Sequence, residues 1–214
     1  MHLSELPTYR KPLSIFLLWL FVVSALIGIT LGYADWFIPK TPINQTLGAV
    51  LLFLNFPIST RRKLAVWLLA FAVGMAVEII GVKTGVLFGE YHYGDNFGWK
   101  LMGVPYLIGV YWAVLVFLTG AIAFRVSKHP VLRILIGAAL MVGLDVLIEP
   151  LAHQFDFWHF TGGMPPLQNY TTWFLVAAGL HTVFVRVVAV SDFWYSLHHF
   201  LSQVGFFVGC LLLV

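Results

Sequence analysis

The chain has 214 residues, of which 60% are hydrophobic and only 10% are charged, and its formal net charge is +3. A soluble domain of this size needs more polar side chains to cover its surface, so the composition excludes an ordinary soluble protein. The basic residues are dispersed, which excludes a nucleic-acid-binding patch as the origin of the positive charge. Cys210 is the one cysteine, so an internal disulfide and a cysteine-based metal site are excluded as well.

Apolar runs of membrane-spanning length recur along the chain. A helix needs roughly 17–25 mostly apolar residues to cross the hydrocarbon core, and most runs reach this length, the second being marginal. The sequence therefore predicts an all-α, polytopic membrane helical bundle of about seven transmembrane helices, forming a single integral-membrane domain over residues 1–214. The expected helices are Leu13–Leu31, Ile43–Ile58, Leu64–Ile80, Val104–Phe124, Val131–Glu149, Tyr170–Val188 and Phe193–Val214.

Lysine and arginine are distributed unequally between the two ends of such a bundle. Nine of the 12 basic residues fall on one side of the bundle, and only Lys40, Lys83 and Lys100 fall on the other. Because the cytoplasmic loops of membrane proteins are enriched in Lys and Arg, we expect a cytoplasmic N terminus and an external C terminus, in a multi-pass protein of the inner (plasma) membrane. The residues on the predicted cytoplasmic side are Arg10, Lys11, Arg61, Arg62, Lys63, Arg125, Lys128, Arg133 and Arg186.

The acidic residues gather on the opposite side. Of the nine, only Glu5 and Asp192 fall elsewhere. Glu78, Asp145 and Glu149 lie inside or at the ends of apolar helices, where an unpaired charge costs about 2.5–3.5 kcal/mol or more. Carboxyl groups kept at such positions, beside loops rich in Tyr, Trp and His, predict proton chemistry. The remaining acids on this side are Asp35, Glu90, Asp95 and Asp156.

Asp145 and Glu149 are four residues apart, so they share one helix face at a separation of about 6 Å. Two acids this close do not both ionise easily in apolar surroundings, and one is expected to keep its proton near neutral pH and to act as a general acid. Pro150 disfavours helical geometry at Glu149, so we expect the helix to kink or end there, opening a cavity beneath the outer loop. The alternative is that either acid only pairs with a Lys or His at a helix end.

Glu78 is a third candidate acid, in the last turn of its predicted helix, and Gly74 is expected to allow a close helix contact one turn earlier. Because an acid near a helix end can simply reach the membrane interface, we expect Glu78 to matter less than the pair. Glu90 is a candidate in the outer loop, although it and Asp95 can equally be solvated surface residues.

The two long outer connections, Gly81–Gly103 and Pro150–Gln168, contain glycines and aromatic residues that suit tight turns or short strands at the interface. The eight histidines lack the HxxxH and HxxHH spacing of membrane di-iron enzymes, so no metal site is predicted. No lysine follows Lys128, which excludes a retinal Schiff base in the last helix. The histidines on the acidic side, which are candidates for proton relay, are His92, His153 and His159.

Four segments of the chain resemble the CruF-type integral-membrane carotenoid biosynthesis proteins, which include carotenoid 1′,2′-hydratases and archaeal bisanhydrobacterioruberin hydratases. The segments are Gly85–Gly94, Gly103–Trp112, Asp145–Ala152 and Asn169–Phe174. The resemblance runs from about Gly74 to Phe174, and the order of the segments is more specific than any one of them.

The resemblance implies a carotenoid hydratase that needs no cofactor and adds water to the terminal isopropylidene double bond of an acyclic carotene. Asp145 or Glu149 would protonate the double bond, and water held by Glu90, His92 or Asn169 would capture the tertiary cation. The implied substrate is a lipophilic lycopene-like or gamma-carotene-like carotenoid that reaches the enzyme through the membrane lipids. The expected aromatic wall around the cation consists of Tyr91, Tyr93, Tyr106, Trp112, Tyr170 and Trp173.

Two other functions are compatible with parts of this pattern. A membrane lycopene cyclase begins with the same protonation but traps the cation within the carotene, so product analysis separates it from a hydratase. A non-enzymatic proton or small-solute pathway would also line a bundle with carboxylates. Such a pathway needs polar residues through the full membrane depth, whereas the inner halves of the predicted helices are nearly all apolar.

Overall fold

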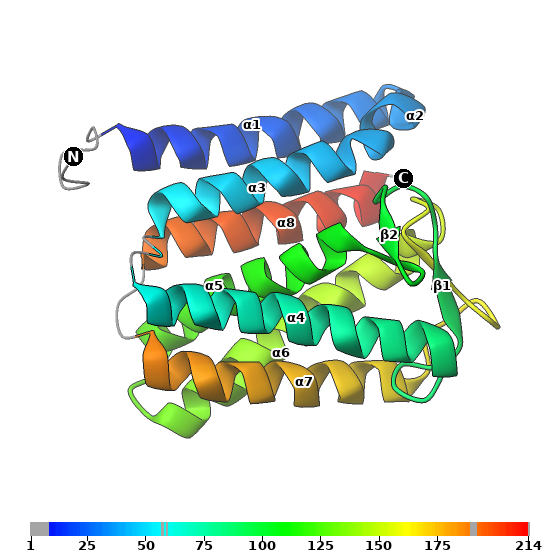
Figure 1. Ribbon diagram of the computed structural model, residues 1–214. Coiled ribbons are helices and arrows are strands. Elements are labelled where there is room, and N and C mark those ends of the chain that lie inside the picture. The colour runs from blue at the N-terminus through cyan, green and yellow to red at the C-terminus, as the bar shows by residue number, and fades with distance from the viewer. Residues whose placement is uncertain (1–8, 57, 59, 189–191, 214) are drawn as a thin grey trace.

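The computed structural model describes residues 9–56, 58, 60–188 and 192–213. Glu5, Pro57 and Val214, which belong to sequence-based predictions, lie outside these residues. The helices run side by side, and the start of α1 and the end of α8 lie at opposite ends of the bundle (Figure 1). The long helices are α1 (Arg10–Thr30), α3 (Thr41–Asn55), α4 (Arg61–Thr84), α5 (Tyr106–Val126), α6 (Pro130–Ala152), α7 (Leu167–Val187) and α8 (Phe193–Leu213), and the short α2 (Ala34–Phe37) and η2 (Ile38–Lys40) connect α1 to α3.

Among the described residues, five helices are long and apolar enough to cross a membrane, namely α1, α4, α5, α6 and α8. This confirms a polytopic helical membrane protein. Helix α3 has 15 residues, fewer than the roughly 17–25 that span a hydrocarbon core. Helix α7 has 21 residues, but polar side chains such as Gln168, Asn169 and His181 interrupt its apolar sequence. The predicted seven long helices are present, and five of them qualify as spans.

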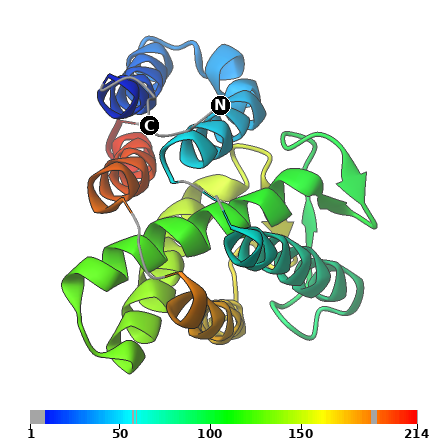
Figure 2. The same cartoon turned by 60° about the vertical axis from the view of Figure 1, so that its left-hand side comes forward.

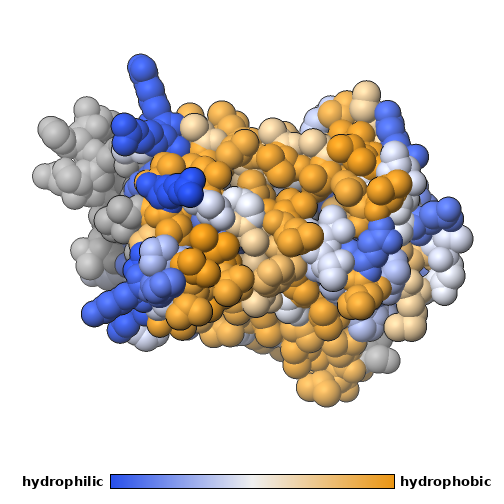
Figure 3. All heavy atoms as spheres, turned by 90° about the horizontal axis from the view of Figure 1, so that it is seen from below, coloured by the Kyte–Doolittle hydropathy of each residue, from blue (hydrophilic) through white to orange (hydrophobic). Residues whose placement is uncertain are grey.

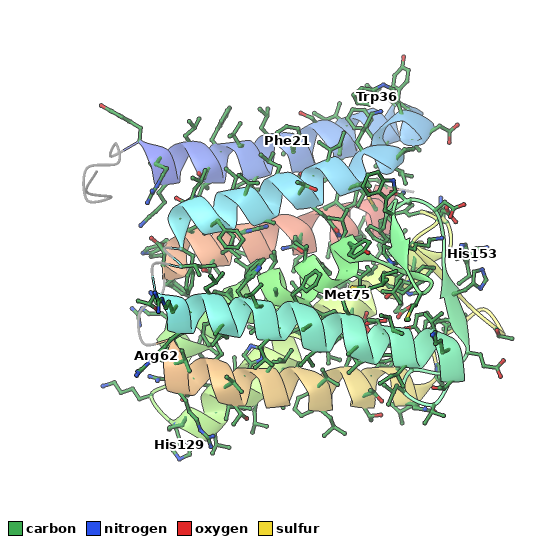
Figure 4. All side chains as sticks on the ribbon, in the orientation of Figure 1. Phe21, Trp36, Arg62, Met75, His129 and His153 are labelled. Carbon is green, nitrogen blue, oxygen red and sulfur yellow. The ribbon has the colours of Figure 1, made fainter. Side chains whose placement is uncertain are left out.

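The surface of the bundle has the polarity expected for a membrane. Hydrophobic side chains form a broad belt, and hydrophilic residues gather towards the two ends (Figure 3). Arg62 and His129 lie at one end and Trp36 and His153 at the other (Figure 4). Because polar groups avoid the hydrocarbon core, the belt defines the part of the surface that faces lipid.

Helix α5 forms the centre of the bundle. It packs against α3, α4, α6, α7 and α8, and it lies between the group formed by α1, α3 and α8 and the helices α4 and α7 (Figure 2). A Cβ atom at Gly74 of α4 would lie 2.6 Å from the Cβ of Trp112 in α5. The predicted close helix contact at Gly74 is therefore confirmed, and the residue that it contacts is Trp112.

Local sequence explains the ends of α4 and α6. Thr60 caps α4 by accepting a hydrogen bond from the backbone N–H of Lys63 at 3.2 Å, and Gly85 ends the helix with a φ of +65°. Of the two outcomes expected at Glu149, a kink or the end of the helix, α6 does not end there and continues to Ala152 with Pro150 inside it. A proline lacks one backbone N–H, so it removes a single helical hydrogen bond and the helix can continue for the rest of the turn.

The two outer connections contain short strands, as predicted, which pair in two antiparallel sheets. β1 (Tyr91–Tyr93) pairs with β4 (Trp158–Phe160), and β2 (Lys100–Leu101) pairs with β3 (Val104–Pro105). Tyr91 lies opposite Phe160, and Tyr93 lies opposite Trp158. Because side chains alternate along a strand, these four aromatic residues point to the same side of the β1–β4 sheet, towards the bundle.

A buried acidic cavity as candidate active site

A cavity lies between α4, α5, α6 and α7, beneath the β1–β4 sheet. Its wall is predominantly apolar and aromatic, and it contains three carboxyl groups. Glu78 comes from α4, and Asp145 and Glu149 come from α6. The space free inside it is about 30 Å³, which is enough for a water molecule. The three acids predicted inside or at the ends of helices therefore lie around one cavity.

Asn169 links the two acids of α6. Its side-chain Nδ2 donates to Asp145 Oδ2 at 3.0 Å and to Glu149 Oε1 at 3.2 Å. The other oxygen of Glu149, Oε2, accepts a hydrogen bond from Trp158 Nε1 at 3.1 Å. Among the described residues, nothing donates to Asp145 Oδ1. The four-residue spacing thus brings both acids to the cavity, but their hydrogen bonding is unequal.

Glu78 accepts more hydrogen bonds than either acid of α6. The hydroxyl groups of Tyr91 and Tyr93 donate to Glu78 Oε2 at 2.5 and 2.8 Å, and Trp112 Nε1 donates to Oε1 at 3.0 Å. Glu78 itself is 2% exposed, so these donors replace the solvation that water would supply. The expectation that Glu78 simply reaches the interface is wrong, because the strand β1 covers it.

Tyr91 and Tyr93 remain neutral donors. Burial raises the pKa of both phenols well above the ordinary value, and the neighbouring charge of Glu78 raises it further. A neutral phenol can donate its proton to a carboxylate, whereas a phenolate cannot. The two tyrosines of β1 therefore stabilise the ionised form of Glu78.

Aromatic rings surround the carboxyl groups. The rings of Trp112 and Trp173 stack with centroids 3.9 Å apart and an interplanar angle of 15°. Tyr91 stacks on Phe160 with centroids 5.2 Å apart. The quadrupoles of such rings present negative faces, which attract a cation held in an apolar site.

The histidines of the outer loops lie outside this cavity. His92 is exposed on the outward side of β1 and stacks on His159 at 5.1 Å between centroids. His159 contacts Nδ1 of His153 at 2.6 Å and Asp156 Oδ1 at 2.9 Å. This hydrogen bond from His159 holds the pKa of Asp156 below its ordinary value. In the described part of the chain, no three His, Cys, Asp or Glu side chains form a group that could hold a metal ion.

The structure brings together most of the predicted site residues, although their roles remain predictions. Trp112 contacts the cavity through Glu78 and Trp173. Glu90 and His92 are exposed, Tyr106 is 45% exposed, and Tyr170 is half-buried beside the cavity without lining it. The predicted residues that line the cavity are Glu78, Tyr91, Tyr93, Asp145, Glu149, Asn169 and Trp173.

Several lining residues were not predicted. Trp158 and Phe160 follow from the alternation of β4, a signal present in the sequence Phe157–Phe160 once a strand is assumed. Tyr111 precedes the predicted Trp112 and lines the cavity from α5. Met141 lies one turn before Asp145, so helical periodicity alone places it on the same face.

Comparisons with known proteins identify the family of the chain. Over 130 residues, the chain is 28% identical to a bisanhydrobacterioruberin hydratase from Haloarcula japonica, covering 56% of this chain and 44% of that protein. The chain thus spans less than half the length of this curated relative. No solved structure matches. The family model for carotenoid biosynthesis proteins matches residues 40–213, which include every residue of the cavity, and the chain therefore belongs to the carotenoid biosynthesis protein family.

Proposed function

We propose that this protein is a hydratase that adds water to the terminal double bond of an acyclic carotene end group. The observation that carries the proposal is one aromatic cavity inside a membrane bundle, holding three carboxyl groups with unequal hydrogen bonding. Membership of the carotenoid biosynthesis family and similarity to a protein named bisanhydrobacterioruberin hydratase support a carotenoid as substrate. The substrate class is a lipophilic carotene, lycopene-like or gamma-carotene-like, which dissolves in the membrane lipids.

Asp145 is the proton donor in this proposal. A carboxyl group whose two oxygens both accept hydrogen bonds is favoured as an anion, because its proton would have to displace a donor. This applies to Glu78 and to Glu149. Asp145 accepts at Oδ2 alone, so Oδ1 is free to carry a proton towards the cavity. The ionised Glu149 nearby favours the protonated form of Asp145.

The intermediate is a tertiary carbocation. Asp145 transfers its proton to the CH carbon of the isopropylidene group, the π bond breaks, and positive charge develops on the carbon that bears the two methyl groups. The Glu78 carboxylate, held by three donors, stabilises this charge together with the faces of Trp173 and Trp158. These groups are already in place before the reaction, so the developing charge requires little rearrangement.

Water then completes the addition. Its oxygen bonds to the cationic carbon, and one of its protons returns to the carboxylate that supplied the first, so the net change is addition of one water without oxidation or reduction. Among the residues predicted to hold this water, Glu90 and His92 are exposed on the outer surface. Asn169 lines the cavity, where it orients both acids of α6.

The proposed setting is the inner (plasma) membrane, with the N terminus in the cytoplasm. Most basic residues of α1, α4, α5, α6 and α7 support this orientation, because they lie at the ends of those helices remote from the cavity, whereas Lys83 lies at the other end of α4. The cavity then lies near the external interface, where the β1–β4 sheet covers it.

The test is expression in a host that accumulates lycopene, followed by mass analysis of the pigments. A hydratase adds the mass of one water at each end that it modifies. A cyclase changes the pigment without changing its mass, and a pathway for protons or small solutes leaves the pigment unchanged. Either of the latter results would contradict the proposed function, and a host without the protein provides the baseline.

A further inference from the structure

The mechanism above leaves one polar group of the cavity unused, the hydroxyl of Tyr111. Helix α5 presents Ile108, Tyr111 and Leu115 to the cavity, at the spacing of one helix face. The neighbours of Tyr111 along this face are therefore apolar. Its hydroxyl is the one group from α5 on this wall that can exchange hydrogen bonds with a bound molecule.

The other two cavity tyrosines are committed elsewhere. Tyr91 and Tyr93 both donate to Glu78 Oε2. Among the described residues, the hydroxyl of Tyr111 has no hydrogen-bond partner, and Asp145 is close enough to interact with it electrostatically. Tyr111 thus lines the same cavity as Asp145, the acid whose Oδ1 has no donor among the described residues.

We propose that Tyr111 binds the water molecule that captures the cation, and this inference rests on the proposed hydratase function. A hydroxyl oxygen accepts one O–H of the water, and the Asp145 carboxylate accepts the other after it has given its proton to the carbon. A lone pair of the water then points at the cation. The C–O bond forms, the water proton passes to Asp145 Oδ1, and the acid is restored for the next cycle.

Loss of this group should change the fate of the cation rather than its formation. Without a positioned water, the cation loses a proton and returns to an alkene. In D₂O, protonation delivers deuterium to the CH carbon, and loss of hydrogen from that carbon leaves deuterium in the recovered alkene. Deuterium in unhydrated carotene therefore counts the cations that formed and were not captured.

The experiment uses proteoliposomes that contain the full chain and an acyclic carotene with isopropylidene ends, incubated in D₂O. Tyr111→Phe should form about tenfold less hydrated product, the effect of losing one hydrogen bond in the step, while deuterium in the recovered carotene rises. Tyr33→Phe is the matched control, because it removes the same hydroxyl from an exposed position that does not line the cavity. It should behave like the unchanged protein.

Two results would overturn the role of Tyr111. One is hydration by Tyr111→Phe at the level of Tyr33→Phe. The other is loss of both hydration and deuterium exchange, which would assign the hydroxyl to cation formation or to the fold. If the unchanged protein forms no hydrated product, the proposed function fails first, so the two failures are distinguishable.

Discussion

Replacing Asp145 with asparagine removes the proposed transferable proton and almost nothing else. The asparagine carbonyl can take the place of Oδ2 and accept the hydrogen bond from Asn169 Nδ2. Its NH₂ group then occupies the position of Oδ1, where no described residue donates a hydrogen bond. No donor is left facing another donor, so the free energy of unfolding should change by about 0.5 kcal/mol or less.

The rate should fall much more than the stability. General acid catalysis contributes roughly 10²–10⁴-fold, which corresponds to about 3–5 kcal/mol of barrier. Asp145→Asn should therefore lose at least about a hundredfold in hydration while the chain still inserts and folds. Deuterium exchange into the recovered carotene should fall by the same factor, because the cation no longer forms.

Glu149→Gln should reduce the stability of the fold more than Asp145→Asn does, and the rate of hydration less. Both oxygens of Glu149 accept hydrogen bonds, one from Asn169 and one from Trp158. An amide group at this position must turn its NH₂ towards one of these donors, which costs about 1–3 kcal/mol of stability. Its effect on the rate should be smaller, acting through the protonation of Asp145.

The assay compares product formed per folded protein in liposomes with the thermal unfolding of the same variants in detergent. Near-normal hydration by Asp145→Asn, with a large loss in Glu149→Gln, would reverse the assignment of the donor. Near-normal product from both variants would show that the proton comes from neither, and Glu78 would be the next candidate.

Three further predictions concern the surroundings of the acids and the orientation. Glu78→Gln should change the free energy of unfolding by about 1 kcal/mol or less, because its amide oxygen can accept from Trp112 Nε1 while its NH₂ group donates to the hydroxyl oxygens of Tyr91 and Tyr93. It should slow hydration, because the negative charge that stabilises the proposed cation is lost; unfolding curves and product analysis measure the two effects. Gly74→Ala should cost about 1–3 kcal/mol because its Cβ meets Trp112 at 2.6 Å, whereas Gly143→Ala, with nothing within 4 Å, should be neutral or slightly stabilising in the same unfolding assay. A reporter fused after Val214 should read as external and one placed within Arg125–Pro130 as cytoplasmic, and the reverse result would invert the proposed orientation.

The helical framework was predictable because its signals are local. Apolar runs of membrane-spanning length fixed the positions of α1, α4, α5, α6 and α8 within a few residues, and the four-residue spacing of Asp145 and Glu149 placed both on one face. The end of α6 near Pro150 was less predictable, since a proline removes only one backbone hydrogen bond and does not by itself end the helix. Periodicity predicts the face of a helix more securely than its end.

The partners of each acid were not predictable from a single sequence, because they depend on pairing between distant loops. Tyr91 and Tyr93 reach Glu78 only because β1 folds over the end of α4 and pairs with β4. The same pairing turns His92 outward, although it lies between two residues that point inward. Without the β1–β4 register, Tyr91, His92 and Tyr93 look like equal candidates for the site.

Three carboxyl groups in an apolar cavity lose the solvation that water would supply, and each receives a different number of hydrogen bonds in its place. Ionised carboxylates in such surroundings are stable only where donors replace the lost water. Glu78 has three donors and Glu149 has two, whereas Asp145 has one shared with Glu149. The acid with the fewest donors is the one that gains most from keeping a proton. In the proposed mechanism, this unequal hydrogen bonding favours Asp145 as the residue that protonates the carotene.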